Sequence, residues 1–304
     1  MDGKNVILAI VLSGLVLIIW ATFFEPPLPR PGTNQSDVEK VQEENNLSSP
    51  SIETTEEKKA ISRSETLKSS KRIFFENENI SGTISLTGGI IDDVILKNYT
   101  KKLNSEEKVV LLNPNNSDDG YYIETGWAST SNEIELPNNK TQWSVKGNSK
   151  LTPSTPVTLE WENGDGIKFL KIIYLDEKFL FKVTQQIQNK GNNSYNFYPY
   201  AQIVRNKKPE IQGFYILHEG FIGVFDQELK EEDYNDIEEK KYTGNYSSGW
   251  LGITDKYWIT AIVPEKNKNF KSEFIYDKNY RANFILTEPI MSAPNQSVSS
   301  EIRI

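Results

Sequence analysis

Residues 80–96 read ISGTISLTGGIIDDVIL, and this stretch decides the fold. Its first half alternates apolar and polar residues, which is the pattern of a strand with one buried face. Gly88 and Gly89 are typical of a tight hairpin turn, and the residues after them run back as a second apolar strand. The stretch therefore predicts a β-hairpin.

The same pattern continues from residue 72 to the end of the chain, with Asn, Gly and Pro turns between short strand-like runs. We expect further strands at 109–112, 121–126, 142–146, 157–162, 167–175, 179–188, 196–204, 214–225, 250–263, 270–276, 283–286 and 298–304. Such spacing predicts an all-β fold, a large antiparallel sandwich. The acidic segment 228–241 has sparse apolar positions, so any helix in it should be short and solvated. We read this segment as a solvated surface, with a charged docking surface as the alternative.

An apolar run without any charge, VILAIVLSGLVLIIWATFF, occupies residues 6–24. At ~1.5 Å per residue, such a helix spans most of a ~30 Å hydrocarbon core. Its length and its bulky end favour a retained transmembrane helix over a cleaved signal peptide or a buried core helix. The residues expected to anchor it in the lipid bilayer are Val6, Leu12, Leu17, Trp20 and Phe24.

Flanking charges predict the orientation of this anchor. Lys4 precedes the span and Glu25 follows it, so the positive-inside tendency favours a cytoplasmic N-terminus with the rest of the chain outside. Residues 25–71 contain no aromatic side chain and are rich in polar residues, which predicts a disordered linker. The expected layout is an anchor at 1–24, this linker, and a β-sandwich domain at 72–304. Because the chain stops inside a strand pattern, we expect that domain to be incomplete at its C-terminal end.

Composition excludes several function classes. A formal net charge of -8 argues against a nucleic-acid partner, and the absence of cysteine excludes disulfides and thiolate metal sites. The single histidine, His218, precedes Glu219, but neighbours on a strand point to opposite faces and do not form an acid/base pair. We therefore expect no catalytic residue, cofactor or metal. The aromatic clusters at 195–200 and 250–258 read as sandwich core, or in part as a groove for a peptide or sugar.

Three segments resemble the YidC membrane protein insertases of Gram-negative bacteria. They read GGIIDDVILKNY at 88–99, YILHEG at 215–220 and GWLGITDKYW at 249–258. The anchor, the linker and the β domain follow in the family's order, so the resemblance covers essentially the whole chain. It implies a large periplasmic β-supersandwich like that of galactose mutarotases, held at the bacterial inner membrane. It also implies that this sequence ends before the helices that perform insertion.

The resemblance further implies a part of an insertase or chaperone, not an enzyme, that assists the insertion and folding of inner-membrane proteins. The implied partners are the Sec translocon with its accessory subunits and nascent membrane proteins. A docking surface is then expected within 214–258, which contains the acidic segment. The residues expected to form it are Phe214, Glu231, Glu232, Asp233, Trp250 and Trp258.

Two alternatives remain open from the sequence. One is a membrane-tethered carbohydrate-binding or aldose-epimerase-like periplasmic enzyme, which rests on the aromatic clusters and the suspected fold. It requires His218 to lie in a cleft beside a carboxylate, and it lacks the second histidine that mutarotases commonly use. The other is a structural envelope adaptor without an insertase half.

Overall fold

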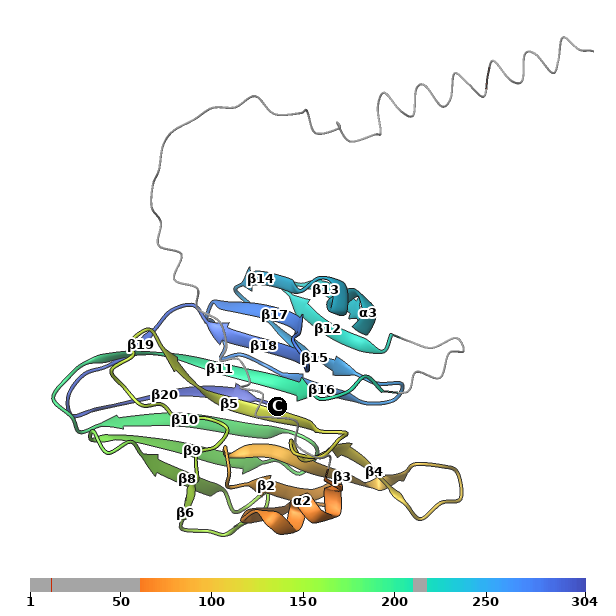
Figure 1. Cartoon of the computed structure of the whole chain (residues 1–304), viewed down its shortest axis with the longest axis horizontal. Helices are drawn as coiled ribbons and strands as arrows, with labels where there is room; N and C mark the ends of the chain where they lie inside the picture. Colours follow the sequence, from red (N-terminus) through yellow and green to blue (C-terminus); the bar gives the residue numbers. More distant parts are fainter. Residues whose placement is uncertain (1–11, 13–60, 210–217) are drawn as a thin grey trace, which may run out of the picture. The chain divides into compact units, whose positions relative to one another are not determined.

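The computed structural model describes residue 12, residues 61–209 and residues 218–304 (Figure 1). The chain divides into two units, 1–45 and 46–304, and the description below concerns the second. In the first unit only Leu12 is described, as a helical residue that is 55% exposed. The other expected anchor residues, Val6, Leu17, Trp20 and Phe24, lie outside the described residues. Among the described helices, none combines the length and apolar character that crossing a bilayer requires.

The described residues form three β-sheets. The first, of eleven strands, has the order β14 (Tyr242–Tyr246), β17 (Phe270–Tyr276), β18 (Tyr280–Leu286), β11 (Tyr195–Arg205), β5 (Tyr121–Ser129), β3 (Ile90–Thr100), β2 (Ile80–Ser85), β1 (Arg72–Glu76) and β7 (Lys150–Leu151), while β19 (Ile290–Ser292) pairs with β11 and β4 (Lys108–Leu112) with β3. The second has the order β20 (Gln296–Arg303), β10 (Phe181–Asn189), β9 (Ile167–Leu175), β8 (Val157–Glu162) and β6 (Ser144–Lys146). The third has the order β13 (Glu228–Asp233), β12 (Gly220–Phe225), β15 (Gly249–Thr254) and β16 (Ile259–Ile262).

The hairpin expected at residues 80–96 is present as β2 and β3, which pair antiparallel. Gly88 and Gly89 have φ angles of +76° and +60°, which side chains with a Cβ atom rarely adopt. Gly82 is needed for a different reason: a Cβ atom there would lie 1.9 Å from the backbone oxygen of Asp93 on the paired strand. The alternating sequence and its glycines therefore explain this part of the large sheet.

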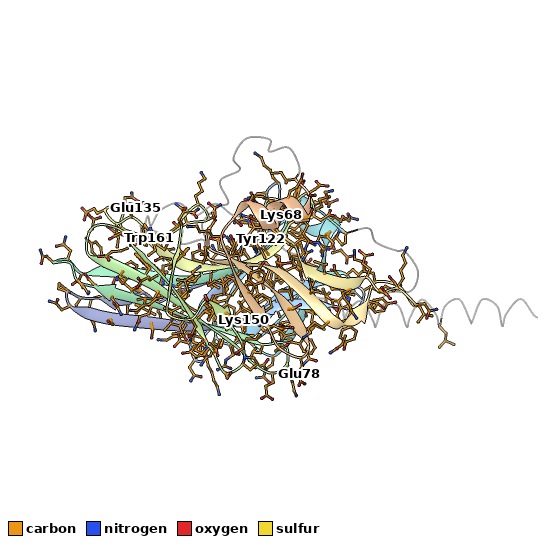
Figure 2. The ribbon with its side chains drawn as sticks, turned by 90° about the horizontal axis from the view of Figure 1, so that it is seen from below. Lys68, Glu78, Tyr122, Glu135, Lys150 and Trp161 are labelled. Carbon is orange, nitrogen blue, oxygen red and sulfur yellow. The ribbon has the colours of Figure 1, made fainter. Side chains whose placement is uncertain are left out.

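One continuous cluster of buried apolar side chains joins the three sheets. Phe169 of β9 packs against Phe197 of β11 with ring centroids 6.1 Å apart, and Phe221 of β12 packs against Phe274 of β17 at 5.2 Å. The two smaller sheets therefore both pack on the large one. Charged side chains such as Lys68 and Glu78 are exposed, whereas Tyr122 inside the fold is 4% exposed (Figure 2).

Two expected elements are wrong in detail. The single strand expected at 250–263 is the antiparallel pair β15 and β16, because the Asp255 amide donates to the Trp258 carbonyl at 2.8 Å and closes a turn. The acidic segment is a strand, β13, followed by the short helix α3 (Tyr234–Glu239). The strand forms because β13 pairs residue by residue with β12. The helix is short as expected but not wholly solvated, since Tyr234 and Ile237 are buried.

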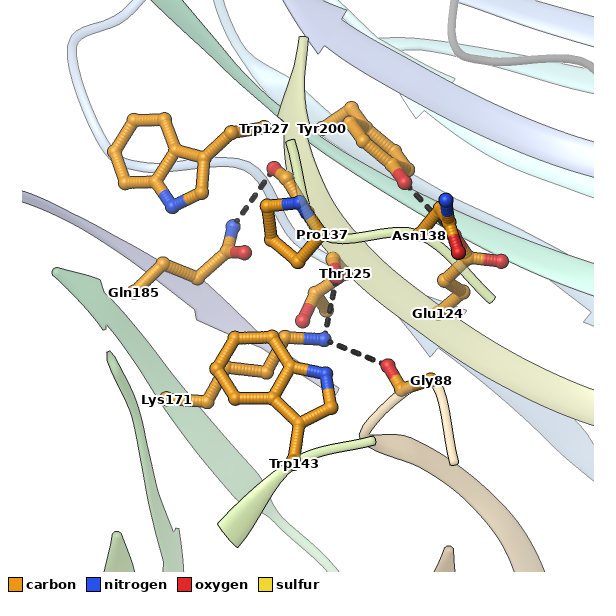
Figure 3. Close-up of a pocket in the computed structure, with 11 residues that line it drawn as sticks. Gly88, Glu124, Thr125, Trp127, Pro137, Asn138, Trp143, Lys171, Gln185 and Tyr200 are labelled. Carbon is orange, nitrogen blue, oxygen red and sulfur yellow. Dashed lines mark hydrogen bonds between the residues drawn. The ribbon is translucent and has the colours of Figure 1, made fainter. Parts of the chain in front are cut away.

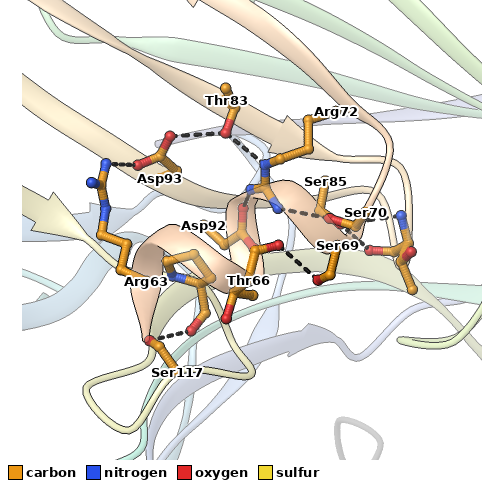
Figure 4. A network of polar contacts seen from close by, with 12 residues as sticks. Arg63, Thr66, Ser69, Ser70, Arg72, Thr83, Ser85, Asp92, Asp93 and Ser117 are labelled. Atoms are coloured by element: carbon orange, nitrogen blue, oxygen red, sulfur yellow. Dashed lines mark hydrogen bonds and ion pairs between the residues drawn. The ribbon is translucent and has the colours of Figure 1, made fainter. Parts of the chain in front are cut away.

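The expected disordered linker is also corrected at its end, where α2 (Arg63–Ser69) forms. Ser62 and Glu65 cap this helix reciprocally, and Arg63 forms an ion pair with Asp93 on β3 (Figure 4). Next to it, Arg72 forms a buried ion pair with Asp92. These contacts stabilise a helix within a tract whose composition alone indicates disorder.

Candidate functional site

Lys171 of β9 and Gln185 of β10 extend from the second sheet toward the large sheet, near the end of the pairing between β3 and β5. The pairing of β3 with β5 has one register position, Ile91 opposite Ile123. Beyond it, the Lys171 ammonium donates to the carbonyl oxygens of Thr125 at 2.7 Å and Gly88 at 3.3 Å (Figure 3). It also donates to the carbonyl oxygen of Gly89 at 3.1 Å. Gln185 donates to the carbonyl of Gly126 at 3.2 Å. These side chains therefore connect the hairpin turn and β5 to the second sheet.

A small pocket lies at this junction. It is lined by Gly88, Glu124, Thr125, Gly126, Trp127, Pro137, Asn138, Trp143, Lys171, Gln185 and Tyr200 (Figure 3). Its free space is about that of one water molecule. Ligand pockets usually offer ~300 Å³ or more, so a sugar ring does not fit here without movement of the lining.

The two oppositely charged side chains of the pocket, Lys171 and Glu124, are both engaged in hydrogen bonds. Burial lowers the pKa of Lys171 from its ordinary 10.5 to about 8, an effect that the Glu124 carboxylate opposes. The Glu124 carboxylate accepts from the Tyr200 hydroxyl at 2.8 Å and from the Gln202 amide at 3.1 Å. Burial and Glu124 raise the pKa of Tyr200 well above its usual range. The pocket thus offers a satisfied ammonium and a satisfied carboxylate, an arrangement suited to holding the sheets together.

Lys171 was not singled out by the sequence reasoning, although a signal was present. It occupies an inward position of β9 between Phe169 and Ile173, where alternation calls for an apolar side chain. A lysine at such a position is rarely buried without partners. The missing information was the identity of those partners, which are backbone carbonyls and leave no pattern in the sequence.

His218 is not among the residues that line this pocket. Its Nε2 atom is 2.8 Å from the carbonyl oxygen of Phe221, and its Nδ1 atom is 3.3 Å from a carboxylate oxygen of Asp233. The histidine therefore has a carboxylate neighbour, as the enzyme hypothesis requires, but the neighbour is Asp233 on β13 and not Glu219. Neither residue lines the pocket of Figure 3.

The expected docking residues separate into groups. Phe214 lies outside the described residues. Glu231 and Asp233 share one face of β13, while Glu232 lies on the other, because alternate residues of a strand point to opposite sides. Trp250 of β15 is paired with Val224 of β12, which is paired on its other side with Leu229 of β13. Trp250 therefore lies on the same face of the sheet as Leu229 and Glu231.

Glu231 and Trp250 belong to a face that is turned away from the core. Strand register places on it a set of half-buried or exposed residues, here called the outer face: Ile222, Val224, Leu229, Glu231, Asp233, Trp250 and Ile259. Leu229 is 55% exposed and Ile259 is 46% exposed. Trp258 is not part of it, since its ring packs at 4.7 Å against Tyr99 of β3. The outer face is therefore an apolar strip with acidic residues at the β13 edge.

These features define a class of protein: a β-supersandwich domain with a small pocket that its own side chains largely fill. Solved structures share the fold. A galactose mutarotase-related enzyme from Lactobacillus acidophilus has a TM-score of 0.55 at 10% identity and covers 77% of this chain and 96% of that one. A galactose mutarotase-like protein from Lactobacillus casei has a TM-score of 0.50 at 9% identity, with 76% and 98% covered. The expected mutarotase-like fold is confirmed, and at such identities the likeness extends to the fold alone.

The sequence profile described as the YidC periplasmic domain matches residues 72–304. The membrane protein insertase YidC of Pelagibacter ubique is 47% identical over 304 residues, which are 100% of this chain and 54% of that protein. The one of Bradyrhizobium diazoefficiens is 33% identical over 330 residues, with 100% and 53% covered. The chain belongs to the YidC membrane protein insertase family, as the resemblance implied, and it is not an enzyme. It spans about half the length of these relatives.

Proposed function

We propose that this chain is the N-terminal part of a membrane protein insertase or chaperone that assists inner-membrane proteins to insert and fold, alone or with the Sec translocon. The family match over residues 72–304 is the observation that carries the proposal. In it, residues 1–24 cross the inner membrane once with the N-terminus in the cytoplasm. The stretch between residue 25 and α2 is the linker, and the β domain is periplasmic.

The domain acts, in this proposal, through protein contact at the outer face. Two features support this surface. Its centre is apolar and half-buried at Ile222, Val224 and Trp250, which is the character of an interface core. Its rim carries the exposed Leu229 and the carboxylate of Glu231. A partner of matching chemistry is an apolar segment with basic residues, such as a periplasmic part of a Sec accessory subunit.

The edge of this sheet adds a second mode of contact. Within the described residues, β13 ends the four-stranded sheet and pairs only with β12. An edge strand leaves backbone groups that an extended peptide can pair with, and charged residues along the edge reduce unspecific pairing. The glutamates of β13 therefore favour a basic partner over self-association.

Crosslinking tests the proposal, because the chain contains no cysteine and each introduced one is unique. A thiol-reactive photocrosslinker is attached to Leu229→Cys on the outer face. As a control it is attached to Phe74→Cys on β1, where the residue is 66% exposed. In native membranes we expect adducts with Sec accessory subunits or nascent membrane proteins at position 229 and not at 74. Trp250→Ala should reduce these adducts. Equal adducts at both positions, or none at 229, contradict a docking role for this face.

The carbohydrate-binding alternative has no comparable support. The closed pocket, with Lys171 and Glu124 both engaged, offers no free acid or base to a sugar.

A further inference from the structure

A second exposed surface lies at the end of the β3–β4 hairpin. The Ser105 amide donates to the Lys102 carbonyl at 3.2 Å, so Leu103 and Asn104 occupy the centre of a tight turn. Asn104 has a φ angle of 62°, which suits a turn. Leu103 is 93% exposed, and the hairpin extends beyond the sheets in Figure 1.

The Trp258 side chain of the β15–β16 turn lies against the base of this hairpin. The rings of Tyr99 and Trp258 meet edge to face at 4.7 Å. Tyr99 is 44% exposed, and the neighbouring Tyr257 is 73% exposed. The Lys256 ammonium lies 5.2 Å from the centre of the Tyr257 ring. Two segments far apart in sequence thus present apolar and amphipathic side chains to solvent together.

The charge of the hairpin differs from that of the chain. Residues 99–108 contain three lysines and two glutamates, a net of +1, whereas the whole chain carries -8. Glu107 is paired with Lys101, and Lys102 and Lys108 are exposed. The basic residues flank Leu103, so long lysine stems can lie along an apolar phase while their ammonium groups stay in water.

We propose that this surface, here called the hairpin tip (Tyr99, Lys101, Lys102, Leu103, Lys256 and Tyr257), contacts the surface of an anionic lipid bilayer. Leucine enters the headgroup boundary, the tyrosines lie at the interface that their rings favour, and the lysines bind lipid phosphates. Exposed lysines adjoin Leu103 here, whereas acidic residues of β13 border the outer face. This distinguishes the hairpin tip from the outer face and favours lipid over protein as its partner.

The contact is weak and reversible because it is small. Burial of one leucine side chain changes a partition constant on the order of ten- to a hundredfold. The lysine contribution is electrostatic and decreases as salt screens it over ~10 Å at 0.1 M. We infer that the hairpin tip orients a domain that is already held near the membrane and does not anchor it.

The test uses the full chain in vesicles with Leu103→Cys carrying an environment-sensitive fluorophore. Vesicles contain phosphatidylglycerol and a lipid with a nitroxide near the headgroup. The matched control is Leu229→Cys, an exposed leucine of the acidic strand β13. The proposal expects a blue shift and nitroxide quenching at 103 and neither at 229. The partition constant of the hairpin tip, measured from either signal at 103, should fall about tenfold when Lys101→Glu and Lys102→Glu are added. The same decrease is expected when phosphatidylcholine replaces phosphatidylglycerol.

Two results overturn the proposal. One is the same quenching at positions 103 and 229, which indicates mere proximity to the bilayer. The other is shielding of position 103 only when further membrane proteins are added, which assigns the hairpin tip to a protein contact. Because Leu103 is exposed, its replacement should leave the fold intact, and an unchanged circular dichroism spectrum checks this.

Discussion

The pH dependence of stability should reveal the buried ammonium of Lys171. Burial lowers its pKa from 10.5 to about 8, and each unit corresponds to 1.36 kcal/mol between the two protonation states. Below about pH 8 the folded and unfolded chains both bind this proton, and the burial costs about 3 kcal/mol. Between about 8 and 10.5 the unfolded chain binds the proton more tightly, so the free energy of unfolding rises with pH in that window.

Lys171→Met removes this titration. The difference in unfolding free energy between the native chain and the variant should therefore grow by about 2 kcal/mol from about pH 8 to about pH 9.5. The sign of the difference at one pH is less informative. Methionine removes the cost of burying charge but leaves the carbonyls of Thr125, Gly88 and Gly89 without their donor, at about 1–3 kcal/mol for each unpaired group. The change of this difference with pH depends only on the titration of Lys171, and not on the lost hydrogen bonds.

Urea denaturation followed by tryptophan fluorescence measures the effect, since the ammonium lies 5.1 Å from the centre of the Trp143 ring. Buried tyrosines such as Tyr122, whose pKa burial raises, titrate near this range only in the unfolded chain; their contribution is the same for both chains and cancels. Parallel stability curves for the native chain and Lys171→Met would refute the reasoning, because they would mean that the lysine retains an ordinary pKa.

Three further outcomes follow from local geometry. Gly82→Ala should lower the free energy of unfolding by about 2 kcal/mol or more, because the added Cβ would lie 1.9 Å from the Asp93 carbonyl oxygen. The control Ser81→Ala should change it by less than about 0.5 kcal/mol. Equal thermal midpoints for the two variants would contradict this. Arg63→Ala should cost about 1–3 kcal/mol and speed hydrogen exchange within α2, because Asp93 is buried and loses its ion pair. Arg303→Ala removes an exposed pair with Glu301 and should leave exchange in α2 unchanged; similar effects of both variants would argue against the ion pair as the cause.

Much of the fold could be predicted from the sequence because strand alternation is local. The strands β8, β9 and β17 begin and end at the expected residues. The division of β15 from β16 was missed because the turn at Asp255 contains neither glycine nor proline. The helix α2 was missed because its capping residues, Ser62 and Glu65, lie in a polar tract, and its ion pair reaches a distant strand.

The candidate sites were less predictable, for a physical reason. The sequence pointed to the region of Glu231 and Trp250 but not to the face they share, since this requires the register of β12 with both neighbours. Glu232 was grouped with them, and alternation of β13 separates it. Side-chain contacts with backbone carbonyls, such as those of Lys171, leave no sequence pattern at all.

Labelling of intact spheroplasts tests most directly whether the β domain faces the periplasm, on which the proposed docking role depends. The cysteine-free chain with Phe74→Cys carries one thiol on β1, at a side chain that is 66% exposed. A maleimide that does not cross membranes should modify it before lysis as completely as after lysis. Modification only after lysis would put the domain in the cytoplasm and contradict the account.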